Sequence, residues 1–397
     1  MVIEIDNSIV DYLELKKGML SCSDKFVVGL NSLLRSFALK QHIVFAELEI
    51  IEYLIECTLI DEINKKALLW LIQKYYSIGL FAKGAEVKVV AYKKDTEKNI
   101  FLKDNTYFVQ IEMFINVSCT QLLAENDRDA DFFIDIANEI NSKVLKYDNI
   151  AIEYCGRAFN GGNVETVVNE VTRKFNFSLC IADSDKDYKE AKDGETLGKA
   201  KVVIKQKREN NVIELLPLMV REKENLFSPL FYMRRLNCSE GILNLLNERI
   251  ENEELLRFFD IKEGFTAKKI RKATPQWHCL YDEFLCECEK RKLLNCRIEE
   301  IGEKDEDFKV LSGLPDKATE KVQSYFFHED ISAKIKKMEL IETVPIEAVE
   351  KERENIVLSK EIYERLPSYL QKDWFEIGKI IYQWCCRVSD EEMFIYS

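Results

Sequence analysis

Acidic side chains follow two apolar runs of the sequence, at the point where each run ends. Glu125 comes directly after the run 119–124, and Asp183-Ser184-Asp185 comes directly after the run 177–182. If both runs are parallel strands of one sheet, their carboxyl ends lie at the same edge and three carboxylates can converge there. An Asp-x-Asp pair suits Mg²⁺, which takes one or two protein carboxylates together with water and phosphate oxygens. The pattern indicates metal-assisted chemistry on a phosphate, with Glu125 sharing the metal or acting as general base.

The same carboxylates also have a structural interpretation, because an Asp-Ser-Asp at a strand end is often a helix cap or a turn. The positions of the glycines favour a site. Five of the fourteen glycines lie just beyond expected strand ends, at positions 156, 161, 162, 194 and 198. Glycines there indicate tight turns at the carboxyl edge of a sheet, where open α/β folds bind their ligands.

The elements that must position these residues alternate regularly through the middle of the chain. Helices are expected through Phe132–Ile140 and over Val164–Val171, where valines recur at helical spacing. Strands are expected at 119–124, 149–155, 177–182 and 212–220. Strands and helices alternating in units of this size imply parallel pairing with right-handed crossovers, so the predicted fold class is α/β.

The flanking regions have different patterns. Residues 1–116 are expected to form an α+β module, with helices between residues 20 and 80 and a hairpin over 86–116. Residues 237–397 have a mainly helical and charged pattern. The predicted organisation is therefore an N-terminal module at 1–116, a central α/β domain at 117–236 and a C-terminal helical region at 237–397.

Composition narrows the class of protein. The chain has 397 residues, 47% of them hydrophobic, and a net charge of −13, which supports large cores and counts against a nucleic-acid coat. No membrane span or signal peptide is expected, so the predicted location is the cytoplasm. The twelve cysteines are scattered through apolar runs, and no disulfide is expected. With only three histidines, carboxylates are the expected catalytic groups.

The order of these motifs resembles a TOPRIM domain, the catalytic fold of topoisomerases, primases and overcoming-lysogenization-defect (OLD) nucleases. The resemblance covers residues 117–235, under a third of the chain, and Asn126 stands where OLD-like members usually have a glycine after the acidic residue. The matching segments are LLAENDRDADFF, NGGNVETV, LCIADSDKDY and VIELLPLMVREKENLFSP. The last of these is similar to the corresponding segment of TOPRIM effectors in bacterial anti-phage systems.

The resemblance implies cleavage of DNA or RNA, such as tRNA, with Mg²⁺ or Mn²⁺ as cofactor. It implies a catalytic and metal-binding set of Glu125, Asp183 and Asp185, with Asp129 and Asp187 as auxiliary metal ligands. Second-line candidates are Arg221 and Glu222, for which a solvated ion pair is an equally good interpretation.

OLD nucleases and related effectors work with an ABC-type ATPase, which needs a phosphate-binding Gly-x₄-Gly-Lys-Ser/Thr loop. The nearest approach to that motif, at 194–200, is one residue short and lacks the hydroxyl, so it is predicted to be an ordinary loop. The ATPase is therefore expected to be a separate chain, and a homo-oligomer is left open.

Nucleic-acid binding by an acidic chain requires local basic patches. The first candidate follows the Asp-x-Asp run and comprises Lys199, Lys201, Lys205, Lys207 and Arg208. The second comprises Lys268, Lys269, Arg271 and Lys272. A solvated helix face is the alternative interpretation of both.

Three further hypotheses stay open. A zinc site is not expected, because the spacing of His278 and the nearby Cys279, Cys286, Cys288 and Cys296 lacks paired Cys knuckles; cysteines on a buried helix face are expected instead. A restriction-type nuclease would use Asp61, Glu86 and Lys88, although a Glu-x-Lys motif arises easily by chance. A TOPRIM-like module that binds a nucleic acid or a partner without cutting is the non-enzymatic alternative.

Overall fold

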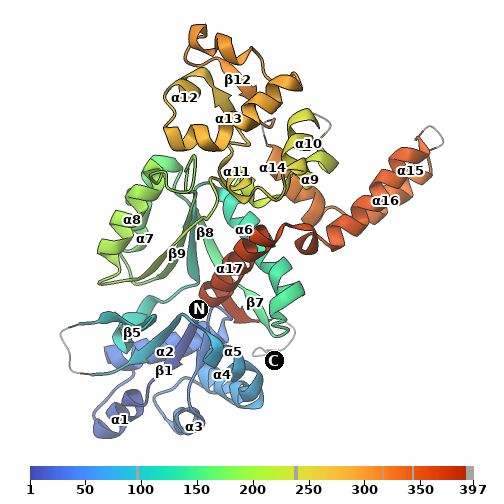
Figure 1. Ribbon diagram of the computed structural model, residues 1–397. Helices are drawn as coiled ribbons and strands as arrows, with labels where there is room; N and C mark the ends of the chain where they lie inside the picture. Colours follow the sequence, from blue (N-terminus) through green and yellow to red (C-terminus); the bar gives the residue numbers. More distant parts are fainter. Residues whose placement is uncertain (95–97, 237–239, 316, 342–343, 390–397) are drawn as a thin grey trace. The chain divides into compact units, whose positions relative to one another are not determined.

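The computed structural model describes residues 1–94, 98–236, 240–315, 317–341 and 344–389. The chain divides into two compact units. The first comprises Met1–Ala182, Gly198–Leu216 and the chain from Glu376 onward, and the second comprises Asp183–Leu197 and Pro217–Phe375. The first unit therefore contains both the N-terminal sheet and the central sheet (Figure 1).

The N-terminal sheet has five strands in the order β2-β1-β3-β5-β4. These strands are β1 (Val2–Ile5), β2 (Ile43–Phe45), β3 (Lys88–Tyr92), β4 (Ile100–Lys103) and β5 (Thr106–Gln110). β1 pairs in parallel with β2 and β3, and β3 pairs in parallel with β5. The hairpin predicted over 86–116 is therefore wrong for β3 and β5. The antiparallel hairpin joins β4 and β5 through Asp104 and Asn105, whose φ angles of 49° and 57° suit a tight hairpin turn.

Helices occupy most of residues 8–84, as their apolar spacing predicts. They are α1 (Ser8–Leu15), α2 (Lys25–Ala38), α3 (Leu48–Glu56), α4 (Glu62–Gln73) and α5 (Tyr75–Gly84). The exception is β2, a fully buried strand of three residues within a run that the sequence predicts as helix. A buried apolar run this short has no periodicity that separates strand from helix.

The central sheet has the strand order β10-β9-β6-β8. Its strands are β6 (Thr120–Ala124), β8 (Tyr154–Ala158), β9 (Phe177–Ala182) and β10 (Val212–Pro217). β6 pairs in parallel with β8 on one side and with β9 on the other, which confirms the parallel pairing predicted for these strands. Every residue of β6 and β9 is buried, as expected for a sheet covered on both faces.

Three helices cover this sheet. They are α6 (Asp127–Ile140), α7 (Val164–Val171) and α8 (Glu195–Lys207). In Figure 1, α7 and α8 lie on one side of β8 and β9, and α6 lies on the other. The part of the first unit that carries the expected site is thus a layered α/β structure with a parallel-strand sheet.

Two predicted segments of the central region differ in the structure. The strand predicted at 149–155 is two strands, since β7 (Ile150–Ile152) pairs antiparallel with β13 (Cys386–Val388) and only β8 joins β6. The loop predicted at 194–200 is wrong because α8 begins at Glu195. Gly194 directly precedes this helix, and Gly198 lies inside it.

One disulfide contradicts the expectation that the chain has none. Cys119 precedes β6 and Cys155 lies in the neighbouring β8, and the two are bonded, with their Cα atoms 6.3 Å apart. Parallel pairing of the two strands brings these Cα atoms within the range that a disulfide requires. The separation of 36 residues gave no sign of this proximity in the sequence.

The second unit is built mainly from helices around an aromatic core. Its helices are α9 (Pro229–Arg235), α10 (Glu240–Glu248), α11 (Glu253–Phe258), α12 (Ala267–Arg271), α13 (Pro275–Lys290), α14 (Ala318–Gln323), α15 (Ile331–Glu339) and α16 (Ile346–Lys360). β11 (Gly264–Thr266) and β12 (Lys309–Ser312) form an antiparallel pair. The buried rings of Phe259, Phe265 and Tyr281 pack edge to face.

Helix α17 (Ser368–Cys385) begins in the second unit and ends in the first. In the first unit, the carbonyl oxygen of Trp384 accepts a hydrogen bond from Thr120 Oγ1 over 2.5 Å, which ties the end of α17 to β6. Within the described residues, no helix is both long and apolar enough to span a bilayer.

Candidate functional site at the ends of β6 and β9

Glu125 is the first residue after β6 and is held by the neighbouring strand. Its carbonyl oxygen accepts a hydrogen bond of 2.9 Å from the Asn160 backbone amide, and the Ala124 carbonyl accepts one of 3.0 Å from Phe159. The parallel pairing of β6 with β8 therefore continues for one residue past the strand ends. This places Glu125 at the carboxyl edge of the central sheet, as the sequence predicts.

A glycine pair follows β8 at the same edge. Gly161 has a φ of 64°, and a Cβ built on it would lie 3.8 Å from Glu125 Oε1. A Cβ on Gly162 would lie 3.9 Å from Lys199 Nζ. The carboxylate of Glu125 therefore lies beside Gly161, and the ammonium group of Lys199 lies beside Gly162. Of the basic residues predicted to bind nucleic acid, Lys199 is brought to this edge.

Asp129, predicted as an auxiliary metal ligand, caps helix α6. Its Oδ2 accepts hydrogen bonds from the backbone amide of Asn126, at 3.1 Å, and from the Asn126 side chain, at 3.3 Å. Asn126 is the N-cap of α6 and forms a reciprocal capping box with Asp129. Asp129 is only 4% exposed, so its carboxylate has a structural role at the start of the helix.

Asp183 is the first residue after β9, and the loop that it opens is fixed by the segment after β10. Ser184 Oγ donates a hydrogen bond of 2.7 Å to the Val220 carbonyl oxygen, and the Asp185 amide donates one of 2.9 Å to the Arg221 carbonyl oxygen. Asp185 adopts a left-handed conformation with a φ of 52°, which Asp and Asn tolerate better than most residues.

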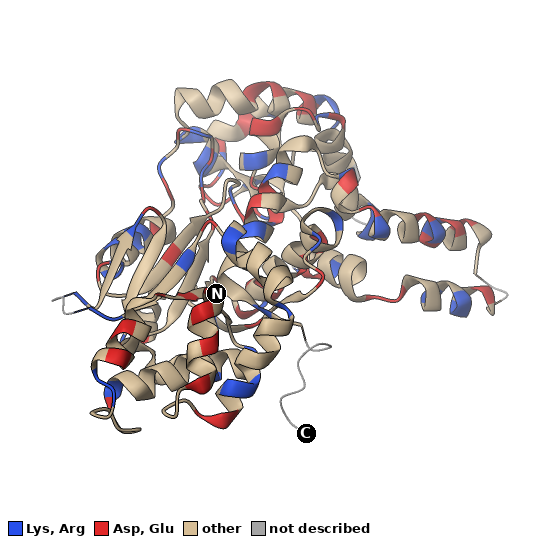
Figure 2. Ribbon diagram, turned by 90° about the horizontal axis from the view of Figure 1, so that it is seen from below, with Lys and Arg blue, Asp and Glu red and all other residues tan. Residues whose placement is uncertain are grey.

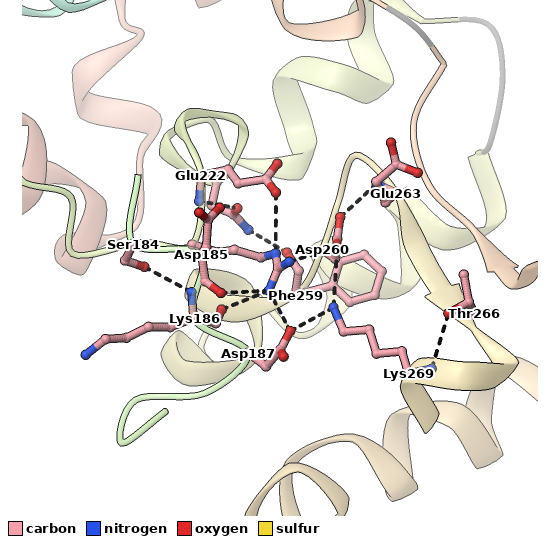
Figure 3. Close-up of polar contacts among 12 residues, drawn as sticks. Ser184, Asp185, Lys186, Asp187, Glu222, Phe259, Asp260, Glu263, Thr266 and Lys269 are labelled. Atoms are coloured by element: carbon pink, nitrogen blue, oxygen red, sulfur yellow. Dashed lines mark hydrogen bonds and ion pairs between the residues drawn. The ribbon is translucent and has the colours of Figure 1, made fainter. Parts of the chain in front are cut away.

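Asp187, Glu222 and Asp260 form an acidic cluster in the second unit (Figure 3), and Arg221 pairs with all three. Its guanidinium lies 2.5 Å from Asp187 Oδ1, 3.1 Å from Asp260 Oδ2 and 3.5 Å from Glu222 Oε1. Lys269 Nζ bridges Asp187 and Asp260 at 2.7 and 3.3 Å. The side chains of Arg221 and Glu222 are each 13% exposed, so the interpretation of these residues as a solvated ion pair is wrong.

Burial perturbs the proton affinities in this cluster. It raises the pKa of Asp185, an effect that Arg221 opposes and Asp260 reinforces. It raises the pKa of Glu222 further, to about 7, with the negative charge of Asp260 adding to the effect and Arg221 opposing it. A carboxyl group that titrates near neutral pH is suited to proton transfer, and such groups concentrate at functional sites.

The acids of the second unit are thus partly neutralised from within. Asp187, predicted as an auxiliary metal ligand, is held by Arg221 and Lys269. No group of three or more His, Cys, Asp or Glu side chains in the described parts of the chain is arranged to hold a metal ion. Because Mg²⁺ usually keeps several waters and takes only one or two carboxylates, a two-carboxylate site remains chemically reasonable.

Basic and acidic positions are interspersed along the helices (Figure 2). In the first predicted patch, Lys201 and Lys205 are exposed on α8, Lys207 is partly buried, and Arg208 pairs with Glu214. In the second, Lys268 and Lys272 pair with Glu306, Lys269 belongs to the Arg221 cluster, and Arg271 donates hydrogen bonds to the carbonyl oxygens of Gly302 and Lys304. The second patch is therefore committed to contacts within its own unit.

The three residues of the restriction-type hypothesis have other structural roles. Glu86 Oε1 lies 2.5 Å from Lys379 Nζ, Lys88 Nζ lies 2.9 Å from Glu4 Oε2, and Asp61 is the N-cap of α4. None of these contacts joins the three residues of the restriction-type hypothesis to one another.

The cysteine-rich stretch lies largely on α13, where His278 Nδ1 is 2.8 Å from Asp282 Oδ1. Cys288 is buried, but Cys279 and Cys286 are exposed, so the expected burial of the cysteines is wrong for these two.

Sequence reasoning missed Asp260, which contacts both Arg221 and Lys269. Asp260 belongs to no motif, and it follows Arg221 by 39 positions. Helix packing in the second unit brings it to the cluster, and no sequence signal marks it.

Comparison of the chain with protein-family models, curated proteins and solved structures finds no match. Any functional conclusion therefore rests on the geometry and chemistry of the site.

Proposed function

We propose that this protein is a Mg²⁺-dependent nuclease with a TOPRIM-like catalytic region. The observation that carries the proposal is the parallel pairing of β6 with β9, since Glu125 and Asp183 are the residues that directly follow these two strands. The Gly161–Gly162 turn supports it, because it leaves space for Glu125 and Lys199 at the same edge.

Each residue has a role in this proposal. Asp183 and Asp185 would hold the metal, which when bound activates water and neutralises charge on the phosphate. Glu125 would share the metal or accept a proton from the attacking water. Lys199 would contact the phosphate backbone, and Glu222, whose pKa is about 7, would serve as a second proton-transfer group.

Cleavage assays test this assignment. DNA and tRNA are incubated with Mg²⁺ or Mn²⁺ and with wild type, Glu125→Gln, Asp183→Asn or the control Glu209→Gln, which removes an exposed carboxylate from the turn after α8. Loss of at least about 100-fold in the first two variants, with the control unchanged, is expected. Equal activity in all four proteins would refute the proposal. Loss of cleavage only in Glu86→Ala would favour the restriction-type nuclease.

A non-catalytic module that binds a nucleic acid or a partner is the second candidate. It is favoured by the neutralisation of Asp187 and Asp260 by Arg221 and Lys269, which leaves less negative charge for a metal. Nucleic-acid binding that persists in Asp183→Asn, without cleavage by the wild type under any metal condition, would support this candidate.

We place the nuclease in bacterial anti-phage defence, under control of a separate ABC-type ATPase. The residues closest to a phosphate-binding loop, 194–200, belong mostly to helix α8, so this segment is not such a loop, and the separate ATPase is proposed on the resemblance alone. Phage challenge of cells that express this protein with and without a neighbouring ATPase gene tests the idea. Protection that requires both genes and Asp183 is expected, and equal survival of cells with and without the two genes would refute it.

A further inference from the structure

A cleft of about 510 Å³ lies in the first unit, and its lining includes neither Gly161 nor Gly162. It is lined by residues of β6 and β8, by the C-terminal half of α7 and by the segment that follows α7. Its volume is within the range of about 300–1,000 Å³ that is usual for small-molecule sites. None of the residues proposed above for catalysis lines it.

Three cations that line this cleft have no carboxylate partner in the described parts of the chain. They are Arg157 in β8 and the pair Arg173 and Lys174 after α7. Among the residues described, none of the three forms an ion pair, although Glu170 lines the same cleft. In a chain with a net charge of −13, carboxylates are abundant, so unpaired cations that share one concavity leave a local positive field available to an anion.

The neighbouring amides are held in fixed positions. Gln121 is 7% exposed, donates a hydrogen bond to the Cys119 carbonyl oxygen and lies 3.5 Å from Arg157 Nε through its Oε1. Asn176 accepts a hydrogen bond of 3.0 Å from Ser118 Oγ and donates one of 3.2 Å to the Val171 carbonyl oxygen. Part of the polar wall is therefore ordered before any ligand arrives, which lowers the entropy cost of binding.

The rest of the wall is apolar. Ala158, Val167 and Val171 line the cleft beside the cations and amides. A ligand that satisfies all three features carries a phosphate for the guanidinium groups, polar edges for the amides and a flat or apolar part for the valines.

We propose that this cleft binds a phosphorylated small molecule of mononucleotide size. Arg157, Arg173 and Lys174 would hold the phosphate, since guanidinium groups bind phosphate oxygens in a bidentate manner. Gln121 and Asn176 would contact the polar edges of the base or sugar. A nucleic-acid strand is the less suitable ligand, because the cations converge on one concavity and do not form a track along the surface.

The cleft lies on the same sheet as the proposed catalytic edge but contains none of its residues, since Arg157 and Ala158 pair with Leu123 and Ala124, which precede Glu125. Gly161 and Gly162 lie before the first residue of α7, whereas Val171, which lines the cleft, is its last residue. Eight helical residues separate the two ends by roughly 12 Å. The proposal does not depend on nuclease activity, so each can fail without the other.

Calorimetric titration tests the cleft directly. The probes are inorganic phosphate and the four ribonucleoside 5′-monophosphates, titrated into the full chain. At least one monophosphate is expected to bind more tightly than inorganic phosphate. The double variant Arg173→Gln/Lys174→Gln is expected to weaken its binding at least about tenfold, and Arg157→Gln similarly.

Lys66→Gln is the control, because Lys66 is an exposed cation on α4 and does not line the cleft. It should bind the monophosphate like the wild type. Absence of binding by every monophosphate would overturn the proposal, and so would binding that the cleft variants leave unchanged. Binding of a single-stranded oligonucleotide, but of no mononucleotide, would also overturn it in favour of a nucleic-acid surface.

Discussion

Replacing Glu222 with glutamine should stabilise the second unit at neutral and alkaline pH and leave its stability nearly unchanged in acid. Burial raises the pKa of Glu222 from 4.5 to about 7, so the folded state binds the proton more tightly than the unfolded state. The stability from this proton is fully present below pH 4.5 and is lost as the pH rises to about 7. Since each tenfold difference in proton affinity is worth about 1.4 kcal/mol, the ionised carboxylate destabilises the fold by about 3 kcal/mol.

The glutamine side chain cannot ionise, and its oxygen can still accept the hydrogen bond that the Glu222 carboxylate accepts from the Asn225 amide. The variant should therefore gain about 1 kcal/mol over wild type near pH 5.5 and about 3 kcal/mol above pH 7. Hydrogen–deuterium exchange of peptides from residues 217–375, measured in urea between pH 4 and 8.5, reports the stability of this unit alone.

The control variant is Glu209→Gln, which removes an exposed carboxylate that forms no ion pair with a described residue. It should change stability by less than about 0.5 kcal/mol across the pH range. Destabilisation by Glu222→Gln at pH 8 would show that Arg221 outweighs burial and holds the carboxylate ionised. That result would refute the reasoning, as would a pH curve that matches the control.

The packing within each unit gives further expected outcomes. A Cβ at Gly194 would overlap Asp185, so Gly194→Ala should lower cleavage at least about tenfold. Gly198→Ala, whose Cβ would enter open space, should keep full activity and raise the free energy of unfolding by up to about 1 kcal/mol. Equal cleavage by the two variants would contradict this reasoning. Asp373→Asn should destabilise the second unit by about 3 kcal/mol, because the buried guanidinium of Arg257 then keeps only the more exposed Glu253 as a charged partner. The double variant Arg257→Met/Asp373→Leu should restore most of the loss in the same exchange measurement. Reduction of the disulfide beside β6, which spans 36 residues, should lower stability by about 4 kcal/mol in urea denaturation, and identical curves with and without reductant would argue against the bond.

The central strands could be predicted because their burial leaves a continuous apolar run. β6 and β9 are buried at every residue, and each run ends at a charged residue in the sequence. β7 differs, since its partner β13 lies more than 230 positions later in the chain. A strand of three residues whose pairing is that distant carries no local signal of its partner, so it was merged with β8 into one predicted strand.

Helix α8 forms where the sequence predicts a loop. Gly194 and Gly198 indicated a loop, but Gly194 precedes the helix and approaches Asp185, while Gly198 lies inside the helix with no atom within 4 Å of its Cβ position. The helix forms despite this glycine because Leu197, Ala200 and Val203 bury one face of it. Tertiary burial of this kind outweighs a propensity cost of about 1 kcal/mol.

The candidate site was predictable where it depends on strand ends and unpredictable where it depends on packing between helices. Glu125 and Asp183 follow from the strand pattern alone. The contacts that place Asp260 and Lys269 around Arg221 follow from the fold of the second unit, and they change the charge that Asp187 offers to a metal. The motifs at the strand ends therefore identify the acidic residues, but not which of them are paired with cations.

Whether a cation already faces a carboxylate decides where an anion should bind. A cation that already faces a carboxylate gains little from a phosphate, because the new contact must replace an existing ion pair and the phosphate meets the negative charge of that carboxylate. Arg221 and Lys269 are in this position, although the sequence places both near candidate motifs. Arg157, Arg173 and Lys174 have no such partner in the described chain and share one cleft. Phosphate recognition is therefore expected first at these three residues, which no sequence motif had singled out.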